Sequence, residues 1–236
     1  MLAFGDKFIE AAEHGVVSLN TTNPVTAVLC DGMGGHEAGE VASRIASETF
    51  MREALRSGVK GLKPALLAAN DAIAREVRKN PARKGMGTTL VAAHVAGDKL
   101  HWISVGDSLL LLSRQGRICR LNQDHSMRTA FSRMVMQGLM TPEDARNQPQ
   151  RNALMSAISG DELSLVDTGL DGFALRSGDV LVLASDGIDD LPVAQLQRRL
   201  VSRKDIRQRL AGLMDDVTAL GNEHQDNLTI AMLEVI

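Results

Sequence analysis

Short apolar runs separated by tight turns occupy the middle of the chain, and they constrain the fold more than any other feature. The runs cover residues 88–95, 99–105, 109–113 and 118–121. Gly97-Asp98 is a typical hairpin turn, and residues 114–116 form another turn of this kind. Turns this short join antiparallel strands, because a parallel crossover needs about a dozen residues or more. We therefore expect antiparallel sheet in this part of the chain.

Apolar residues at helical spacing flank this block on both sides. The pattern predicts helices over residues 37–55, 64–79, 193–201 and 205–220. It also predicts further short strands over residues 15–19, 25–30, 163–166, 179–184 and 228–236. Helices grouped around runs of strands indicate an α+β fold rather than a regular βαβ succession.

The chain of 236 residues shows neither an internal repeat nor a linker, so we expect one domain over residues 1–236. Residues 122–150 interrupt the strand pattern with a polar stretch that contains Pro142 and Pro149. An excursion of this length within a domain is often a functional lid or flap. We expect that role for residues 122–150.

Composition and charge exclude several classes of function. The formal net charge is −3, so no overall basic field favours nucleic acid as a partner. No run approaches the roughly 18 uninterrupted apolar residues of a membrane span, and the first residues lack the pattern of a signal peptide. The cysteines, Cys30 and Cys119, form neither a CxxC pair nor a secreted disulfide pattern. These features predict a cytoplasmic protein, with Cys30 as a core residue rather than a nucleophile.

Four aspartates recur at the ends of apolar strands. Asp31, Asp107 and Asp186 stand where a strand stops, and Asp226 stands where the last strand begins. Strands of one sheet can bring such ends together, and carboxylates packed closely raise one another's pKa unless a cation lies between them. Oxygen-only ligands favour hard ions such as Mg²⁺ or Mn²⁺. A second interpretation is that Asp-Gly pairs are simple turns, and the residue pattern alone leaves both interpretations open.

A family resemblance favours the metal site. Residues 31–36 (DGMGGH) closely resemble the central motif of bacterial type 2C (PPM family) metal-dependent protein phosphatases. Later signatures follow in the family's order at residues 86–89 (MGTT), 105–108 (VGDS), 124–126 (DHS), 185–187 (SDG) and 226–229 (DNLT). The resemblance implies a four-layer αββα sandwich of two antiparallel sheets flanked by helices, with a metal site at one edge. It also implies a Mg²⁺- or Mn²⁺-dependent phosphoserine/phosphothreonine phosphatase, whose phosphoprotein substrates are made by an opposing serine/threonine kinase.

The resemblance assigns a role to each residue of the site. Asp31 would bridge two ions, Asp186 and Asp226 would complete the shell of one ion, and the carbonyl of Gly32 would help hold the other. Asp107 together with Asp186 resembles a third, weaker metal site of bacterial members. Two ions about 4 Å apart lower the pKa of a bridging water, which then attacks phosphorus directly.

The leaving serine or threonine oxygen needs a proton, and the resemblance makes His36 the donor. A general acid of this kind typically contributes about 10²–10⁴-fold in rate. The alternative for His36 is a helix-entry residue hydrogen-bonded to a nearby carboxylate. We expect Thr88 and Thr89 to be structural supports, and His125 to lie at the surface.

The sequence departs from the family at its beginning. Members normally start with a strand carrying Arg-x-x-Asn-Glu/Gln-Asp, and the nearest alignment here puts Met1 at the arginine and Asp6 at the last position. Methionine cannot grip a phosphate as a guanidinium fork does, so no residue is assigned to that role. Three explanations remain: a truncated or misassigned start, substitution by Lys7 or Arg44, or a pseudophosphatase that binds phosphoprotein with impaired catalysis.

Overall fold

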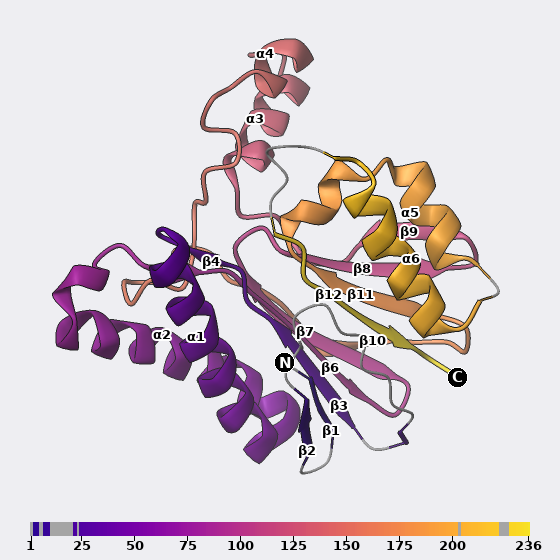
Figure 1. Ribbon diagram of the computed structural model, residues 1–236, viewed down its shortest axis with the longest axis horizontal. Coiled ribbons are helices and arrows are strands. Elements are labelled where there is room, and N and C mark those ends of the chain that lie inside the picture. The colour runs from indigo at the N-terminus through magenta and orange to yellow at the C-terminus, as the bar shows by residue number, and fades with distance from the viewer. Residues whose placement is uncertain (1, 5–6, 10–20, 23, 203, 222–226) are drawn as a thin grey trace.

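The computed structural model describes residues 2–4, 7–9, 21–22, 24–202, 204–221 and 227–236. Within these residues the strands form two main antiparallel sheets (Figure 1). The first sheet has the order β10-β7-β6-β3-β1-β2 and contains β1 (Leu2–Phe4), β2 (Lys7–Ile9), β3 (Val25–Leu29), β6 (Leu90–Ala96), β7 (Lys99–Val105) and β10 (Asp167–Ala174). The second has the order β12-β11-β8-β9 and contains β8 (Leu109–Arg114), β9 (Arg117–Arg120), β11 (Val180–Ala184) and β12 (Ile230–Glu234). A short ladder joins β4 (Gly32–Met33) to β5 (Gly87–Thr88).

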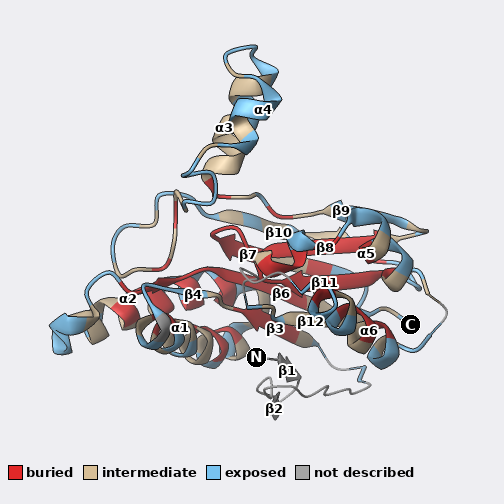
Figure 2. Ribbon diagram, turned by 45° about the horizontal axis from the view of Figure 1, so that its top comes forward, coloured by how far each residue is buried: buried red, intermediate tan, exposed pale blue. Residues whose placement is uncertain are grey.

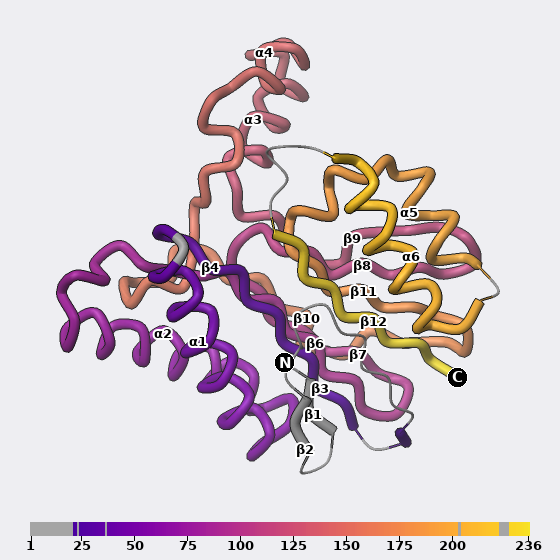
Figure 3. The backbone as a smooth tube through the Cα atoms, viewed as in Figure 1, coloured from indigo at the N-terminus to yellow at the C-terminus, as the bar shows by residue number. Residues whose placement is uncertain are grey.

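Helices cover the outer faces of both sheets. Helices α1 (His36–Ser57) and α2 (Leu62–Lys79) lie side by side over the first sheet, as the backbone tube in Figure 3 shows. Helices α5 (Val193–Leu200) and α6 (Ile206–Thr218) cover the second sheet. Single 3₁₀ turns stand at Gly58–Gly61, Pro81–Arg83 and Asp186–Asp190. None of the described helices combines the length and apolar character that a membrane span needs.

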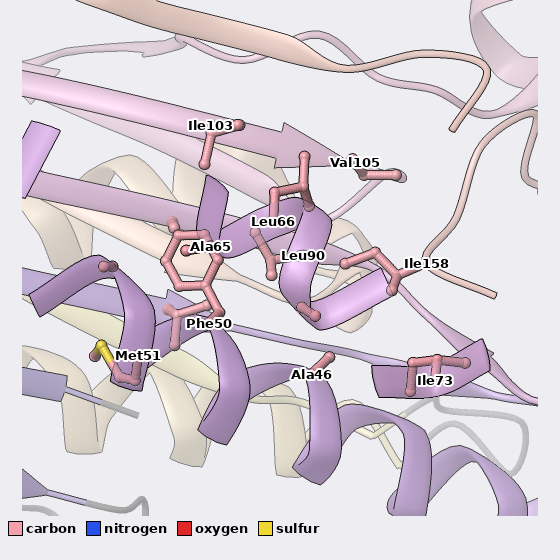
Figure 4. Packing of buried hydrophobic residues seen from close by; sticks show 14 of the residues in the cluster. Ala46, Phe50, Met51, Ala65, Leu66, Ile73, Leu90, Ile103, Val105 and Ile158 are labelled. Atoms are coloured by element: carbon pink, nitrogen blue, oxygen red, sulfur yellow. The ribbon is translucent and has the colours of Figure 1, made fainter. Parts of the chain in front are cut away.

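The alternation of side chains along the strands produces three apolar layers. On β3, Val28 packs toward α1 and α2, whereas Ala27 and Leu29 on the opposite face pack with Leu181 and Leu183 of β11. These inter-sheet residues are almost fully buried, as the red strands of Figure 2 show. Figure 4 shows the helix–sheet layer. The αββα sandwich and the α+β class expected from the sequence are confirmed.

Helices α3 (Met127–Met136) and α4 (Pro142–Arg146) project away from the sandwich, and their surfaces are largely exposed or intermediate (Figure 2). They lie within the excursion that the sequence indicated at residues 122–150. A lid role for this projection stays a prediction.

One expected strand is wrong, and one lies outside the described residues. Residues 163–166 are not a strand, and β10 instead begins at Asp167. The sequence pattern does not indicate β10, because this strand contains Gly169 and Gly172, and glycine is disfavoured inside strands. A Cβ atom on Gly169 would lie 2.3 Å from the Trp102 ring of β7, so the indole requires glycine there. The strand predicted over residues 15–19 lies outside the described residues.

Candidate metal centre

Hydrogen bonds from the neighbouring strand fix the backbone of Asp31. The residue lies two positions after the last residue of β3, and its carbonyl accepts from the Thr89 N–H (2.8 Å) and the Thr88 hydroxyl (2.8 Å). Its own N–H donates to Thr89 Oγ1 (3.0 Å). Thr88 and Thr89 therefore support Asp31, as the sequence suggested.

The loop after Asp31 packs backbone against backbone on the start of α1. A Cβ atom on Gly32 would lie 2.0 Å from the Gly39 carbonyl oxygen. A Cβ atom on Gly39 would lie 2.8 Å from the carbonyl carbon and oxygen of Gly32. Both positions therefore require glycine. Gly32 is exposed, and α1 begins four residues later at His36. The side chain of His36 lies outside what the structure describes.

Asp186 follows β11 and opens a 3₁₀ turn (Asp186–Asp190). The preceding residue, Ser185, donates through its hydroxyl to the Asn227 carbonyl (3.1 Å) and accepts from the Thr229 N–H (3.0 Å). The segment that leads into β12 is therefore held beside the segment that follows β11. Asp226 precedes this anchored segment and lies outside the described residues.

Asp107 lies in the turn between β7 and β8 and is only 5% exposed. Burial, followed by the negative charge of Asp186, raises the pKa of its carboxyl to about 6, although the charge of Arg128 opposes the shift. The structure thus places Asp107 and Asp186 within electrostatic reach of each other. Buried carboxylates with oxygen donors only are a donor set that fits Mg²⁺ or Mn²⁺.

Arg128 is a functional candidate that the sequence analysis missed. Its Nη2 lies 3.0 Å from Asp107 Oδ2, its Nη1 lies 2.8 Å from Asp189 Oδ2, and its Nε lies 3.6 Å from Asp124 Oδ2. The guanidinium of Arg128, near the start of α3, therefore binds carboxylates of two segments: the turn between β7 and β8, and the 3₁₀ turn after β11. Asp124 precedes α3, so the spacing of four residues between Asp124 and Arg128 is not a helix-face pair and gave no signal for this role.

His125 is buried, and the surface position expected for it is wrong. Its ring Nδ1 accepts a hydrogen bond from the backbone N–H of Gly106 (3.2 Å), and the backbone N–H of His125 donates to the Gly106 carbonyl (3.1 Å). Burial lowers the pKa of the imidazole, which disfavours its protonated form. His125 supports the turn that presents Asp107.

The structure brings only part of the predicted site into view. Asp31 and Gly32 share one anchored loop, and Asp107 and Asp186 influence each other's charge. Across the described residues, which exclude Asp226, no three or more histidine, cysteine, aspartate or glutamate side chains form a metal-holding group. The complete ligand set therefore stays a prediction.

A sequence model of one family spans nearly the whole chain. The model described as protein phosphatase 2C matches residues 14–229. The chain belongs to this family. The family assignment agrees with the resemblance of the DGMGGH segment.

Curated members of the protein phosphatase 2C family align over most of this chain. Serine/threonine protein phosphatase PstP of Mycobacterium tuberculosis is 33% identical over 239 residues, which cover 98% of this chain and 45% of PstP. The chain thus spans less than half the length of that relative. Serine/threonine phosphatase stp of Listeria monocytogenes is 29% identical over 94% of this chain and 89% of its own length.

Solved structures of the family share the fold. The serine/threonine phosphatase PstP/Ppp of Mycobacterium tuberculosis superimposes with a TM-score of 0.76 at 30% identity, over 94% of each chain. The serine/threonine phosphatase of S. agalactiae gives a TM-score of 0.78 at 27% identity, over 100% of this chain and 98% of the other. A PstP catalytic domain in complex with two manganese ions gives a TM-score of 0.73 at 27% identity, over 94% of this chain and 95% of the other.

Proposed function

We propose that this chain is a Mn²⁺- or Mg²⁺-dependent phosphoserine/phosphothreonine protein phosphatase. The observation that carries the proposal is the family match over residues 14–229. The PstP catalytic domain with two manganese ions supports the choice of metal. Its substrates are phosphoproteins, formed by a serine/threonine kinase that this enzyme opposes, and its location is the cytoplasm.

The proposed ligands are the carboxylates of Asp31, Asp186 and Asp226 and the carbonyl of Gly32, with Asp107 and Asp186 forming a third position. When bound, the ions supply a water of lowered pKa and neutralise phosphate charge. The hydrogen bonds from Thr88 and Thr89 hold Asp31 in a fixed position, so little reorganisation is needed when an ion binds.

His36 is proposed as the proton donor to the leaving oxygen, since it is the first residue of α1 and directly follows the Gly-rich loop. No residue is assigned to the grip on the substrate phosphate, and substitution by a cation such as Lys7 or Arg44 stays one of the explanations. Arg44 is exposed on α1, and Met1 and Asp6 of the altered N-terminal motif lie outside the described residues. The pseudophosphatase alternative is not supported, because the matched relatives are named phosphatases.

Hydrolysis of an aryl phosphate and a phosphoserine peptide tests the proposal. We expect turnover with Mn²⁺, its loss in chelator, and its loss in Asp186→Asn, because that change removes one negative charge from the ligand set. Asp190→Asn is the matched control, since Asp190 is exposed on the same 3₁₀ turn. Turnover by the wild-type protein that does not depend on Mn²⁺, or an equal loss in both variants, would reject the proposal.

A further inference from the structure

An open hollow of about 210 Å³ lies between helices α3 and α4 on the projection. Phe131 and Val135 of α3 and Pro142 and Ala145 of α4 supply its apolar wall. A hollow of this size accommodates a few side chains rather than a folded partner. Its apolar wall suits an aliphatic side chain.

Arginines line the rest of the hollow. Arg128, Arg146 and Arg151 contribute to it, and Arg146 and Arg151 are exposed. Among the described residues, neither Arg146 nor Arg151 forms an ion pair with an acidic side chain. Their guanidinium groups therefore have capacity to bind carboxylates from another molecule.

The projection differs in charge from the chain that carries it. Residues 127–153 contain four arginines, one glutamate and one aspartate, which gives a net charge of +2, whereas the whole chain has −3. Within this segment the charge of Arg128 is already paired with Asp107 and Asp189, so Arg146 and Arg151 are the lining residues that favour an acidic ligand at the hollow.

Arg128 connects the hollow to the candidate metal centre. Its side chain lines the hollow and also binds Asp107 and Asp189. A polypeptide whose phosphorylated residue enters the centre therefore has neighbouring residues within reach of the hollow.

We propose that the hollow between α3 and α4 binds the substrate segment that flanks the phosphorylated residue, and that it prefers an acidic side chain beside an aliphatic one. This inference rests on the proposed phosphatase function and adds a substrate preference to it. Arg146 and Arg151 pair with the carboxylate, and the apolar wall takes the aliphatic group. Both arginines determine specificity and do not touch the reacting atoms.

Two phosphoserine peptides that differ only in one flanking pair, Glu-Leu or Lys-Leu, test the preference. We expect the wild-type protein to favour the Glu-Leu peptide. The double change Arg146→Glu/Arg151→Glu should raise KM for that peptide roughly tenfold, because each exposed ion pair is worth up to a few-fold and reversal adds repulsion. kcat and the turnover of an aryl phosphate, which has no flanking residues, should stay unchanged.

Arg133→Glu is the matched control, because Arg133 is exposed on the same helix and does not line the hollow. This variant should leave the preference for the Glu-Leu peptide intact. An equal rise in KM for both variants would show general electrostatic attraction and overturn the proposal. So would an unchanged preference in the double variant, or a loss of aryl phosphate turnover in it.

Peptide binding without turnover separates this proposal from the phosphatase proposal. Fluorescence anisotropy of the labelled Glu-Leu peptide is measured with Asp186→Asn protein, with and without the Arg146→Glu/Arg151→Glu change. Weaker binding after the arginine change supports the proposal that the hollow binds the peptide, even if the wild-type protein hydrolyses no substrate. Equal binding overturns the proposal that the hollow binds the peptide, even if the wild-type protein is an active phosphatase.

Discussion

Replacing Arg128 with methionine removes the charge that lies between the projection and the sandwich. The Arg128 and Asp107 side chains are 16% and 8% exposed, so this ion pair is mostly withdrawn from water. Breaking a fully buried pair costs about 3–5 kcal/mol, and an exposed pair is worth about 0.2–1 kcal/mol. Asp189, the other close partner, is 41% exposed, so its pair with Arg128 contributes a free energy in the range of an exposed pair. We therefore expect Arg128→Met to lower the free energy of unfolding by about 2–3 kcal/mol.

A double-mutant cycle isolates the pair with Asp107. Urea unfolding is measured for wild type, Arg128→Met, Asp107→Asn and the double variant, in chelator so that no ion replaces the guanidinium. In the Asp107→Asn background, Arg128→Met should cost only about 1 kcal/mol, because the remaining partners are the exposed Asp189 and the more distant Asp124 at 3.6 Å. Arg133→Met serves as the exposed control on the same helix and should have little effect. An equal cost of Arg128→Met in both backgrounds would refute the reasoning.

Two further changes test the packing of the sandwich and of the metal loop. Arg114 forms a bidentate pair with Asp179 (2.8 and 2.6 Å), and this hydrogen bonding lowers the pKa of the Asp179 carboxyl. Asp179→Asn should therefore destabilise the protein at neutral pH. In urea titrations the difference from wild type should shrink below about pH 4, because the carboxyl of the unfolded chain is protonated first and that of the native state only at lower pH; a difference that is constant down to pH 2 would contradict this. Gly39→Ala should cost more than about 2 kcal/mol and weaken Mn²⁺ binding measured by calorimetry, because its Cβ would meet the backbone of Gly32. Gly85→Ala, at φ +88 with open space around it, should cost only about 1–2 kcal/mol of backbone strain and leave Mn²⁺ binding unchanged.

The sequence predicted most of the strands because apolar alternation and turn residues coincide along them. β6, β7 and β8 lie within a residue or two of their expected bounds. It failed at β10, where Gly169 is required by the Trp102 ring rather than by the local chain. A contact between residues 67 positions apart leaves no local pattern, so periodicity could not reveal it.

The sequence indicated the motifs of the candidate site and the support by Thr88 and Thr89, but it did not indicate the contacts of Arg128 and His125. The aspartates stand in recognisable local settings, and Cys30 packs against the core, where burial raises the pKa of its thiol to about 12. The role of Arg128 and the burial of His125 depend on how residues 122–150 fold back on the turn at Asp107. Such contacts follow from tertiary packing, so a single sequence carries little signal for them.

The hydrogen bonds of Ser185 have a consequence for when the protein becomes able to bind metal. They join the end of β11 to Asn227 and Thr229, which lead into the last strand of the chain. During synthesis, Ser185 leaves the ribosome some forty residues before Asn227 and Thr229 do. In the proposed centre, a nascent chain therefore cannot hold an ion between Asp186 and Asp226 until β12 has docked. Metal binding between these two residues would thus follow the pairing of β12 with β11.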